Sequence, residues 1–466
     1  MFESLRLGGV ALVLLACSSA SSGEGTPNGG ADAGGASAGT GGAPSGGSQS
    51  GGSGNSGGRG NGGASGDGGL ASGGAASGGM AGAAGSGSGG AATGGAGGAG
   101  NAGGQWVLGY YAGYQIDDYP IDVIDWSALT HVAFAPLLVN ADRSLDFTFD
   151  DSHGTGPADA RALATAAHQH GVKALMMLGG ANAGARIAAA ADDAHRAAFV
   201  SALITALSDY GYDGIDLDWE DSVNLDDLVS LAKDLRAAKP DIVLSYPGGP
   251  INPNIESAVD PRYVDLATAL DRYDVQTYYP TMAVAGYGWS SWFLSPLGGS
   301  SPVTPIAIDD TLSRLSQAGI PKAKLGMGTA FYAICYTGGI TGPRQPTDGT
   351  GAQIVGGDNA YPLRAFFASG STFDLSTAAE RKRDTEAAAP YLSLAAPVND
   401  PGCGASTQYV SYEDETSLIA KGTFSKQNGY GGIIVWTIQE GYLNAGASGG
   451  RSRNALMEAL KRGFLD

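Results

Sequence analysis

Short apolar runs alternate with longer amphipathic stretches along residues 105–466. The eight apolar runs that predict strands begin near Trp106, Thr130, Val172, Asp213, Ile242, Asp274, Lys324 and Gly431. Helical patterns lie between them, for instance over 158–170, 195–210 and 224–238, and a final helix is expected over 453–462. Strands that alternate with helices in this way predict an α/β fold, a parallel (β/α)₈ or TIM barrel.

One interval between strand starts is much longer than the others. Successive starts are 24 to 50 residues apart, whereas Lys324 and Gly431 are separated by 107 residues. We therefore expect a small α+β insertion after the seventh strand, at approximately 332–408, and both Cys335 and Cys403 lie in it.

The fourth strand combines apolar residues with carboxylates. In Asp213-Gly214-Ile215-Asp216-Leu217-Asp218-Trp219-Glu220, four acids occupy eight positions of a chain that is only 15% charged. Strand side chains alternate between faces, so Asp216, Asp218 and Glu220 point the same way, spaced roughly 6.6 Å apart along the strand. Acids this close raise one another's pKa, an arrangement typical of proton-transfer sites. A calcium loop is the alternative, but such loops place their acids among Asn and Gly.

In a TIM barrel the catalytic groups lie at the C-terminal ends of the strands. Glu220 ends the fourth strand, and Asp218 and Asp216 are expected to lie successively deeper in the barrel. Asp213 has the opposite strand parity to this group, so we assign it a structural role.

The first 104 residues differ from the rest in composition. Residues 18–104 contain 38 of the 78 glycines and almost no large apolar side chains, so they predict a disordered tether. Before them, Arg6 precedes a short apolar run, so residues 1–17 are expected to be an export signal. Leu14-Leu15-Ala16-Cys17 resembles the lipobox of bacterial lipoproteins, in which the cysteine is lipidated. The alternative is ordinary secretion without an anchor.

The net charge of −19 lies mostly on residues 105–466. Residues 1–104 have two arginines and four acids, which leaves −17 for the remainder. Such a charge disfavours nucleic acids and anionic polymers, and it suits a neutral substrate. The only membrane contact that we expect is a lipid anchor at Cys17. We expect a monomer, located at the cell surface or outer membrane if it is anchored and secreted otherwise.

Cys335 and Cys403 are the two remaining cysteines. In an exported chain such a pair favours a disulfide over unpaired thiols. The five histidines show no metal-ligand spacing, so the sequence predicts no metal and no cofactor.

The acidic segment Asp213-x-x-Asp216-x-Asp218-x-Glu220 resembles the DxxDxDxE motif of glycoside hydrolase family 18, the chitinase-like group. Weaker similarities extend over residues 105–466. The segments that resemble the family's other strands are 106–111 (WVLGYY), 130–135 (THVAFA), 178–180 (LGG), 276–279 (QTYY) and 432–436 (GIIVW). Three positions depart from the family pattern. Met177 replaces the serine of SxGG, and Gln276 and Tyr279 replace the methionine and the aspartate of MxYD.

The resemblance implies hydrolysis of β-1,4-linked N-acetylglucosamine polymers by substrate-assisted, retaining catalysis, in which the 2-acetamido group of the sugar is the nucleophile. It implies catalytic roles for Glu220, as acid and base, and for Asp218, Asp216 and Tyr278. The residues expected to bind the sugar are Trp436, Tyr110, Phe134, Gly180, Tyr279 and Trp289. For Trp289 and its aromatic neighbours, the alternative is a hydrophobic anchor for their loop.

Two other functions stay open at this point. An endo-β-N-acetylglucosaminidase acting on N-glycans shares the acidic motif, and the change at Tyr279 keeps it possible. A non-catalytic chitin-binding lectin is the third candidate, although lectins of this family usually lack the residue at Glu220.

Overall fold

The computed structural model describes residues 104–466, apart from a few short segments (152, 253, 255–257, 279–287, 349, 359–360, 368–370, 374–380 and 445–449). Three sequence-based predictions fall outside this part of the chain: the signal segment with Cys17, the tether up to residue 103, and the role of Tyr279.

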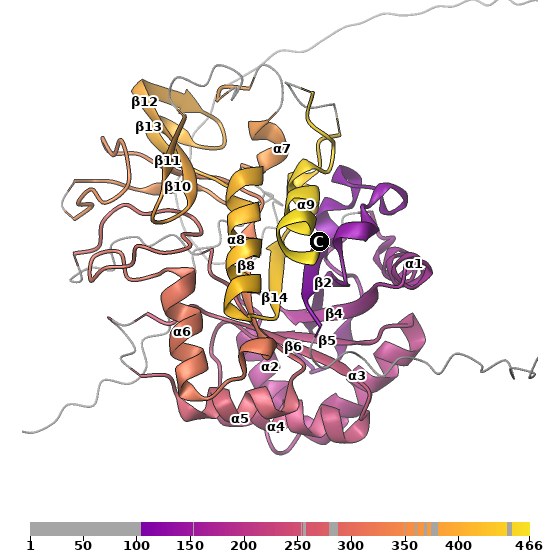
Figure 1. The fold of residues 1–466 in the computed structure, drawn as a ribbon. Coiled ribbons are helices and arrows are strands. Elements are labelled where there is room, and N and C mark those ends of the chain that lie inside the picture. Colours follow the sequence, from indigo (N-terminus) through magenta and orange to yellow (C-terminus); the bar gives the residue numbers. More distant parts are fainter. Residues whose placement is uncertain are drawn as a thin grey trace, which may run out of the picture. The chain divides into compact units, whose positions relative to one another are not determined.

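Eight parallel strands form a closed barrel, as the strand pattern predicts (Figure 1). Around the barrel the order is β1-β14-β8-β7-β6-β5-β4-β2, and pairing of β1 with β2 closes it. The bounds are β1 Trp106–Ala112, β2 His131–Val139, β4 Lys173–Gly179, β5 Gly214–Asp218, β6 Val243–Gly248, β7 Arg272–Val275, β8 Leu325–Ala330 and β14 Gly432–Trp436. The short β3 (Leu145–Asp146) pairs antiparallel with the end of β2.

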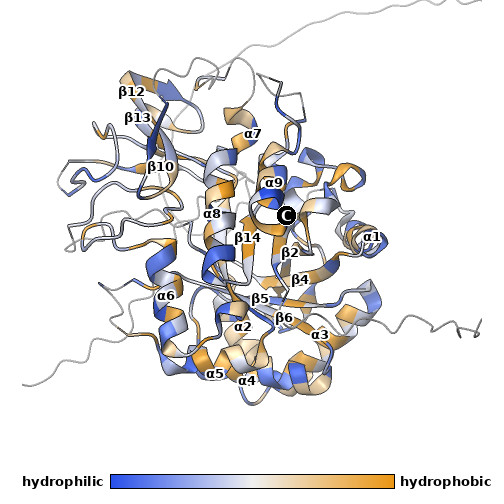
Figure 2. Ribbon diagram, in the orientation of Figure 1, coloured by the Kyte–Doolittle hydropathy of each residue, from blue (hydrophilic) through white to orange (hydrophobic). Residues whose placement is uncertain are grey.

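Helices surround the barrel. They are α1 Gly156–Gln169, α2 Gly184–Ala191, α3 Arg196–Tyr210, α4 Leu225–Ala238, α5 Pro261–Ala269, α6 Ile308–Ala318, α8 Glu415–Asn428 and α9 Ala455–Leu460. Both α6 and α8 carry hydrophilic as well as hydrophobic residues (Figure 2). The final helix continues as a π-helical turn over Lys461–Leu465.

Strand alternation divides the buried side chains into two groups. Ile215, Leu217 and Trp219 belong to a large cluster that also contains core residues of α1, α3 and α4, so this face of β5 packs against the helices. A second cluster includes Trp106, Tyr110 and other inward-facing strand residues, and it continues into buried residues beyond the barrel strands. Asp216 and Asp218 have the inward parity.

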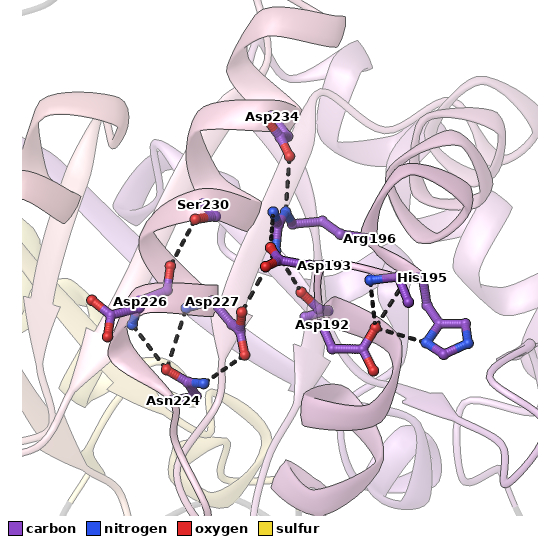
Figure 3. A network of polar contacts seen from close by, with 11 residues as sticks. Asp192, Asp193, His195, Arg196, Asn224, Asp226, Asp227, Ser230 and Asp234 are labelled. Atoms are coloured by element: carbon purple, nitrogen blue, oxygen red, sulfur yellow. Dashed lines mark hydrogen bonds and ion pairs between the residues drawn. The ribbon is translucent and has the colours of Figure 1, made fainter.

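An ion-pair network joins the two helices that flank β5 in the sequence (Figure 3). Arg196, at the first position of α3, contacts Asp193, Asp227 and Asp234, the last two on α4. The start of α4 is fixed by Asn224, whose side chain accepts hydrogen bonds from the backbone N–H groups of Asp226 and Asp227. These contacts tie α3 to α4 and so help to position the acidic strand between them.

A second, antiparallel sheet lies between β8 and α8, at the predicted insertion. Its order is β10-β9-β13-β12-β11, with bounds β9 Ile334–Tyr336, β10 Ile354–Gly356, β11 Arg381–Asp384, β12 Ala389–Asp400 and β13 Gly404–Ser411; a single helical turn, α7, spans Leu363–Phe366. A disulfide joins Cys335 on β9 to Cys403 just before β13, with 5.3 Å between their Cα atoms.

Within the described residues, no helix is long and apolar enough to cross a bilayer.

Candidate active site

Asp216 and Asp218 of β5 and Glu220, just beyond its end, form a column that rises from the barrel interior toward its C-terminal rim. Asp216 is fully buried, Asp218 is 2% exposed and Glu220 is partly exposed. The strand itself ends at Asp218, and a tight turn through Trp219, whose N–H donates to the Leu217 carbonyl, carries the chain to Glu220. The order of the acids in the sequence therefore matches their depth in the barrel.

Asp216 is held by two hydroxyl groups. Tyr110 donates a hydrogen bond to its Oδ2 (2.8 Å), and Ser245 on β6 donates to its Oδ1 (2.5 Å). Burial raises the pKa of Asp216 to about 6, although both hydrogen bonds act in the opposite direction. The point of half-ionisation of this buried carboxyl therefore lies near pH 6.

Asp218 and Glu220 share one donor. The Nε2 atom of Gln276 lies 2.8 Å from Oε1 of Glu220 and 3.3 Å from Oδ1 of Asp218. Burial, followed by the charges of Glu220 and Asp216, raises the pKa of Asp218 well above its usual range. Burial also raises the pKa of Glu220, the Gln276 hydrogen bond lowers it, and the charges of Asp221 and Asp358 raise it. A raised pKa keeps a carboxyl group protonated at higher pH, as a general acid requires.

Aromatic side chains lie around Tyr110, which contacts Asp216. Trp436 ends β14, is half-buried, and its ring centroid lies 5.2 Å from that of Tyr110. Tyr278 is 5% exposed and belongs to the same buried cluster as Tyr110. Its ring lies so close to Gly328 that a Cβ atom there would approach within 2.7 Å of Tyr278. Trp436 therefore packs against the ring whose hydroxyl holds Asp216.

Gly180 lies beside Asp218, where a side chain would not fit easily. Its φ of +101° is in a region that favours glycine, and its N–H donates to the Asp218 carbonyl (2.7 Å). A Cβ atom at this position would lie 3.1 Å from Cε of Met177 and 3.9 Å from Oδ2 of Asp218. The backbone at Gly180 thus approaches the acid column closely.

Asp213 lies at the opposite end of β5 from Glu220. It accepts hydrogen bonds from Lys173 (2.7 Å), from the Ala174 N–H (2.9 Å) and from His168 (2.8 Å). These contacts join β5 to β4 and to α1. Asp213 accordingly does not belong to the acid column.

Two of the predicted sugar-binding residues, Phe134 and Trp289, are buried in the structure. Phe134 is fully buried in the outer cluster, where its ring packs edge-on against Phe149 at 5.0 Å. The neighbouring Ala133 and Ala135 are the residues of β2 that face into the barrel. The structure therefore places the Phe134 ring on the face of β2 opposite to Ala133 and Ala135, and its role in sugar binding stays a prediction.

Trp289 does not form the exposed aromatic platform that a sugar would stack on. It is only 4% exposed, and its carbonyl accepts a hydrogen bond from Thr347 (2.7 Å). The adjacent Trp292 and Phe293 are fully buried and pack against each other. In the described part of this loop, the aromatic residues therefore act as a hydrophobic anchor.

Sequence reasoning missed three polar residues near the column. Asp274 on β7 is completely buried, accepts a hydrogen bond from Nε1 of Trp106 (3.1 Å), and has a strongly raised pKa because of burial and then the charge of Asp216. Its position between Tyr273 and Val275 could have predicted that Asp274 faces the barrel interior, because side chains along this strand alternate as they do around Asp216. Gln276 was noted only as a departure from the family pattern.

Asp358 is the third. It follows β10 in the insertion, its charge contributes to the raised pKa of Glu220, and it accepts a hydrogen bond from the Tyr114 hydroxyl (3.2 Å). No local pattern in the sequence marks it.

The described residues contain no group of three or more His, Cys, Asp or Glu side chains arranged to hold a metal ion. The column is instead suited to proton transfer, with a partly exposed acid above two buried ones.

Comparison with known proteins relates this geometry to a family. The model of glycosyl hydrolases family 18 matches residues 106–441. A probable endochitinase of Caenorhabditis elegans is 27% identical over 296 residues, which cover 59% of this chain but only 45% of the nematode protein. A chitinase-like effector of Moniliophthora perniciosa is 24% identical over 411 residues, 76% of this chain and 86% of that protein.

Solved structures show the same fold. The Group IV chitinase of Ostrinia furnacalis, in complex with allosamidin, has a TM-score of 0.63 at 20% identity, over 77% of this chain and 98% of that chain. Since the family model spans well over half of the sequence, the chain belongs to glycosyl hydrolase family 18.

Proposed function

We propose that the chain hydrolyses β-1,4-linked polymers of N-acetylglucosamine, either chitin or its oligosaccharides, by substrate-assisted, retaining catalysis. The observation that carries this proposal is the column of Asp216, Asp218 and Glu220, which become less buried in that order and all have raised pKa values. Family membership and chitinase-named relatives support a glycosidase.

In the first half of the proposed reaction, the carboxyl of Glu220 donates its proton to the glycosidic oxygen, and the bond from that oxygen to the anomeric carbon breaks. The carbonyl oxygen of the sugar's own 2-acetamido group attacks the anomeric carbon, which gives an oxazolinium ion. Asp218 accepts a hydrogen bond from the acetamido N–H and balances the developing positive charge. Asp216 shares a proton with Asp218, so the two carboxyl groups titrate as a coupled pair.

In the second half, the Glu220 carboxylate takes a proton from water, and the resulting hydroxide oxygen attacks the anomeric carbon. The oxazolinium ring opens, the acetamido group is restored, and Glu220 is again protonated. Two successive attacks at one carbon leave its configuration unchanged. Tyr278 would bind the acetamido oxygen, and Trp436 would lie beneath the sugar ring.

The test compares products from chitooligosaccharides and from a high-mannose glycopeptide, with the wild-type chain and with Glu220→Gln. We expect cleavage of the oligosaccharides to the retained anomer, and a fall of about 10²–10⁴ in the turnover of Glu220→Gln. Cleavage between the two core sugars of the glycopeptide instead would favour the N-glycan endoglycosidase. Binding of chitooligosaccharides without turnover of either substrate would favour the lectin.

A second substrate series tests the role of the acetamido group. Oligomers whose sugars lack the N-acetyl group have no internal nucleophile, so we expect no cleavage of them. Equal rates with and without that group would contradict substrate assistance while leaving a glycosidase possible.

We also propose that the chain is exported and anchored by lipidation of Cys17, with residues 18–104 as a tether. The resemblance to a lipobox and the glycine-rich composition support this proposal. Mass spectrometry of the N-terminal peptide from the producing cell would test it, and an unmodified N-terminus beginning elsewhere would contradict it.

A further inference from the structure

Gln276 occupies a rigid position directly above β7. Its backbone N–H donates to the carbonyl of Gly248 at the end of β6 (2.9 Å). The next residue, Thr277, is fastened to β8, since its hydroxyl donates to the Gly328 carbonyl and accepts from the Gly328 N–H, both at 2.9 Å. The backbone around Gln276 is therefore tied to both neighbouring strands, and its side chain is only 5% exposed.

The side-chain amide of Gln276 is placed between the two upper acids of the column. An amide nitrogen has two N–H groups, so it can donate to two acceptors at once. The two contacts, 2.8 Å to Oε1 of Glu220 and 3.3 Å to Oδ1 of Asp218, use this capacity. A methionine, which stands at this position in the MxYD segment that residues 276–279 resemble, has no hydrogen to donate.

We propose that Gln276 is a positioning residue for the hydrolysis proposed above: by donating to both Asp218 and Glu220, it holds these two carboxyl groups in one relative orientation. The effect of Gln276 on catalysis depends on the proposed function, whereas its contact with the two acids depends only on the geometry. Glu220 lies beyond the end of β5, where ladder hydrogen bonds no longer fix the chain, so a contact from the rigid end of β7 supplies the missing constraint.

The contact has a consequence for the pH dependence of turnover. Burial raises the pKa of Glu220, and the Gln276 hydrogen bond, which favours the ionised form, lowers it; the charges of Asp221 and Asp358 raise it. Without the amide donor, the pKa of Glu220 should rise. The protonated acid would then persist to higher pH, and the alkaline limb of the pH–kcat profile should move upward.

The experiment substitutes Gln276→Met, which keeps the length of the side chain and removes the donor. We expect kcat on a chitooligosaccharide to fall about tenfold or more, as for loss of a hydrogen bond to a charged group, with a smaller change in KM. The alkaline limb should shift to higher pH. The matched control is Gln317→Met, on the exposed face of α6, which should leave kcat and its pH profile unchanged.

A second measurement does not depend on activity. The titration of Glu220 is followed by ¹³C NMR with labelled glutamate, and the Glu220 signal is identified by its absence in Glu220→Gln. In Gln276→Met the signal should titrate at higher pH than in the wild-type protein. An identical midpoint in the two proteins, or a wild-type kcat and pH profile in Gln276→Met, would overturn the inference.

The two proposals fail in different ways. If the wild-type chain turns over none of the N-acetylglucosamine substrates, the proposed function fails. The NMR titration still decides whether Gln276 lowers the pKa of Glu220. If Glu220→Gln abolishes turnover and Gln276→Met does not alter it, the proposed function stands and the role of Gln276 is refuted.

Discussion

Asp216, Asp218 and Glu220 share one strand end but differ in their access to water and in their hydrogen-bond partners. Two hydroxyl donors support the deepest acid, whereas one amide serves both of the upper two. Because each ionised carboxyl raises the pKa of the next, the column cannot ionise fully without a large electrostatic cost. At least one proton is therefore retained in the column over a range of pH, which is the condition for acid catalysis at its rim.

The first prediction concerns the contribution of Asp216 to stability. Its pKa in the folded protein is about 6, above the ordinary value of 3.8. The folded state therefore binds more protons between these values, so this contribution is full below about pH 4 and is lost as the pH rises through 6. At 1.36 kcal/mol per pH unit, the loss is about 3 kcal/mol. Asp216→Asn should remove it, which urea unfolding at pH 4 and pH 7 would measure.

Asp213→Asn provides a control, because the contribution of Asp213 to stability has the opposite pH dependence. Burial alone would raise the pKa of Asp213, but hydrogen bonds from Lys173, Ala174 and His168 outweigh it and leave the pKa lowered. Its contribution is therefore present at neutral pH and lost as the pH falls. Asp213→Asn should destabilise the protein more at pH 7 than in acid. A pH-independent effect of Asp216→Asn would contradict the first prediction.

The residues of the site were predictable only where a pattern is local. Alternation along residues 213–220 is a property of eight consecutive residues, so it orients Asp216, Asp218 and Glu220 without knowledge of the fold. The contact of Gln276 with these acids joins the ends of two different strands, and its geometry depends on barrel closure. The packing of Phe134 against Phe149 was not predictable for a related reason, since similarity of a strand does not specify which of its faces points inward.

At the scale of elements, the barrel strands were predictable because most of them are short, mainly apolar runs, although β7, which contains Arg272 and Asp274, is not. The long interval after Lys324 likewise predicted an insertion. The pairing order inside that insertion was not predictable, because its short antiparallel strands are joined by contacts distant in sequence, such as the pairing of β9 with both β10 and β13.

The second prediction concerns the packing between β7 and β8. A Cβ atom on Gly328 would lie 2.6 Å from the Val275 carbonyl oxygen and 2.7 Å from the Tyr278 ring, so one of them must move. Gly328→Ala should destabilise the protein by about 1–3 kcal/mol through overpacking. Displacement of Tyr278 should lower kcat by about tenfold or more, because catalysis is sensitive to small shifts of positioning groups. Kinetics at a temperature where both proteins are folded would measure this effect.

The matched control for that substitution is Gly249→Ala, since no atom lies within 4 Å of a Cβ at this exposed position just after β6. It should leave stability and kcat nearly unchanged. If Gly328→Ala acts through Tyr278, adding Tyr278→Phe should change kcat less than it does in the wild-type background. Simple additivity of the two effects would contradict this explanation.

The third prediction concerns a buried ion pair at the start of α8. Glu413 and Lys421 contact each other and each has 1% side-chain exposure, and the Ser417 hydroxyl donates to Glu413 (2.6 Å). Lys421→Met should cost about 3–5 kcal/mol, because it leaves an uncompensated charge in the interior. The double variant Glu413→Gln, Lys421→Met should cost less. Denaturant unfolding would compare them, and a single variant as stable as the double one would contradict the argument.

At the scale of the whole molecule, the charge of residues 105–466 is strongly negative, and the proposed substrate is neutral. The net charge of −19 is carried by 45 acids against 26 basic residues, and acidic side chains also lie next to the site, at Asp221 and Asp358. A field of this sign acts on charged ligands and not on an uncharged sugar. Discrimination by charge should therefore separate neutral chitooligosaccharides from cationic, deacetylated ones.

The fourth prediction follows from this separation. Salt shortens the range of the field from roughly 10 Å at 0.1 M to 3 Å at 1 M. The KM for a fully acetylated chitooligosaccharide should therefore stay within about twofold between these concentrations, since the sugar carries no charge to be screened. Binding of a deacetylated, cationic oligomer, measured by calorimetry, should weaken markedly over the same range. A comparably steep salt dependence for the neutral oligomer would mean that charged groups dominate recognition, which contradicts recognition of an uncharged sugar by aromatic and hydrogen-bonding groups.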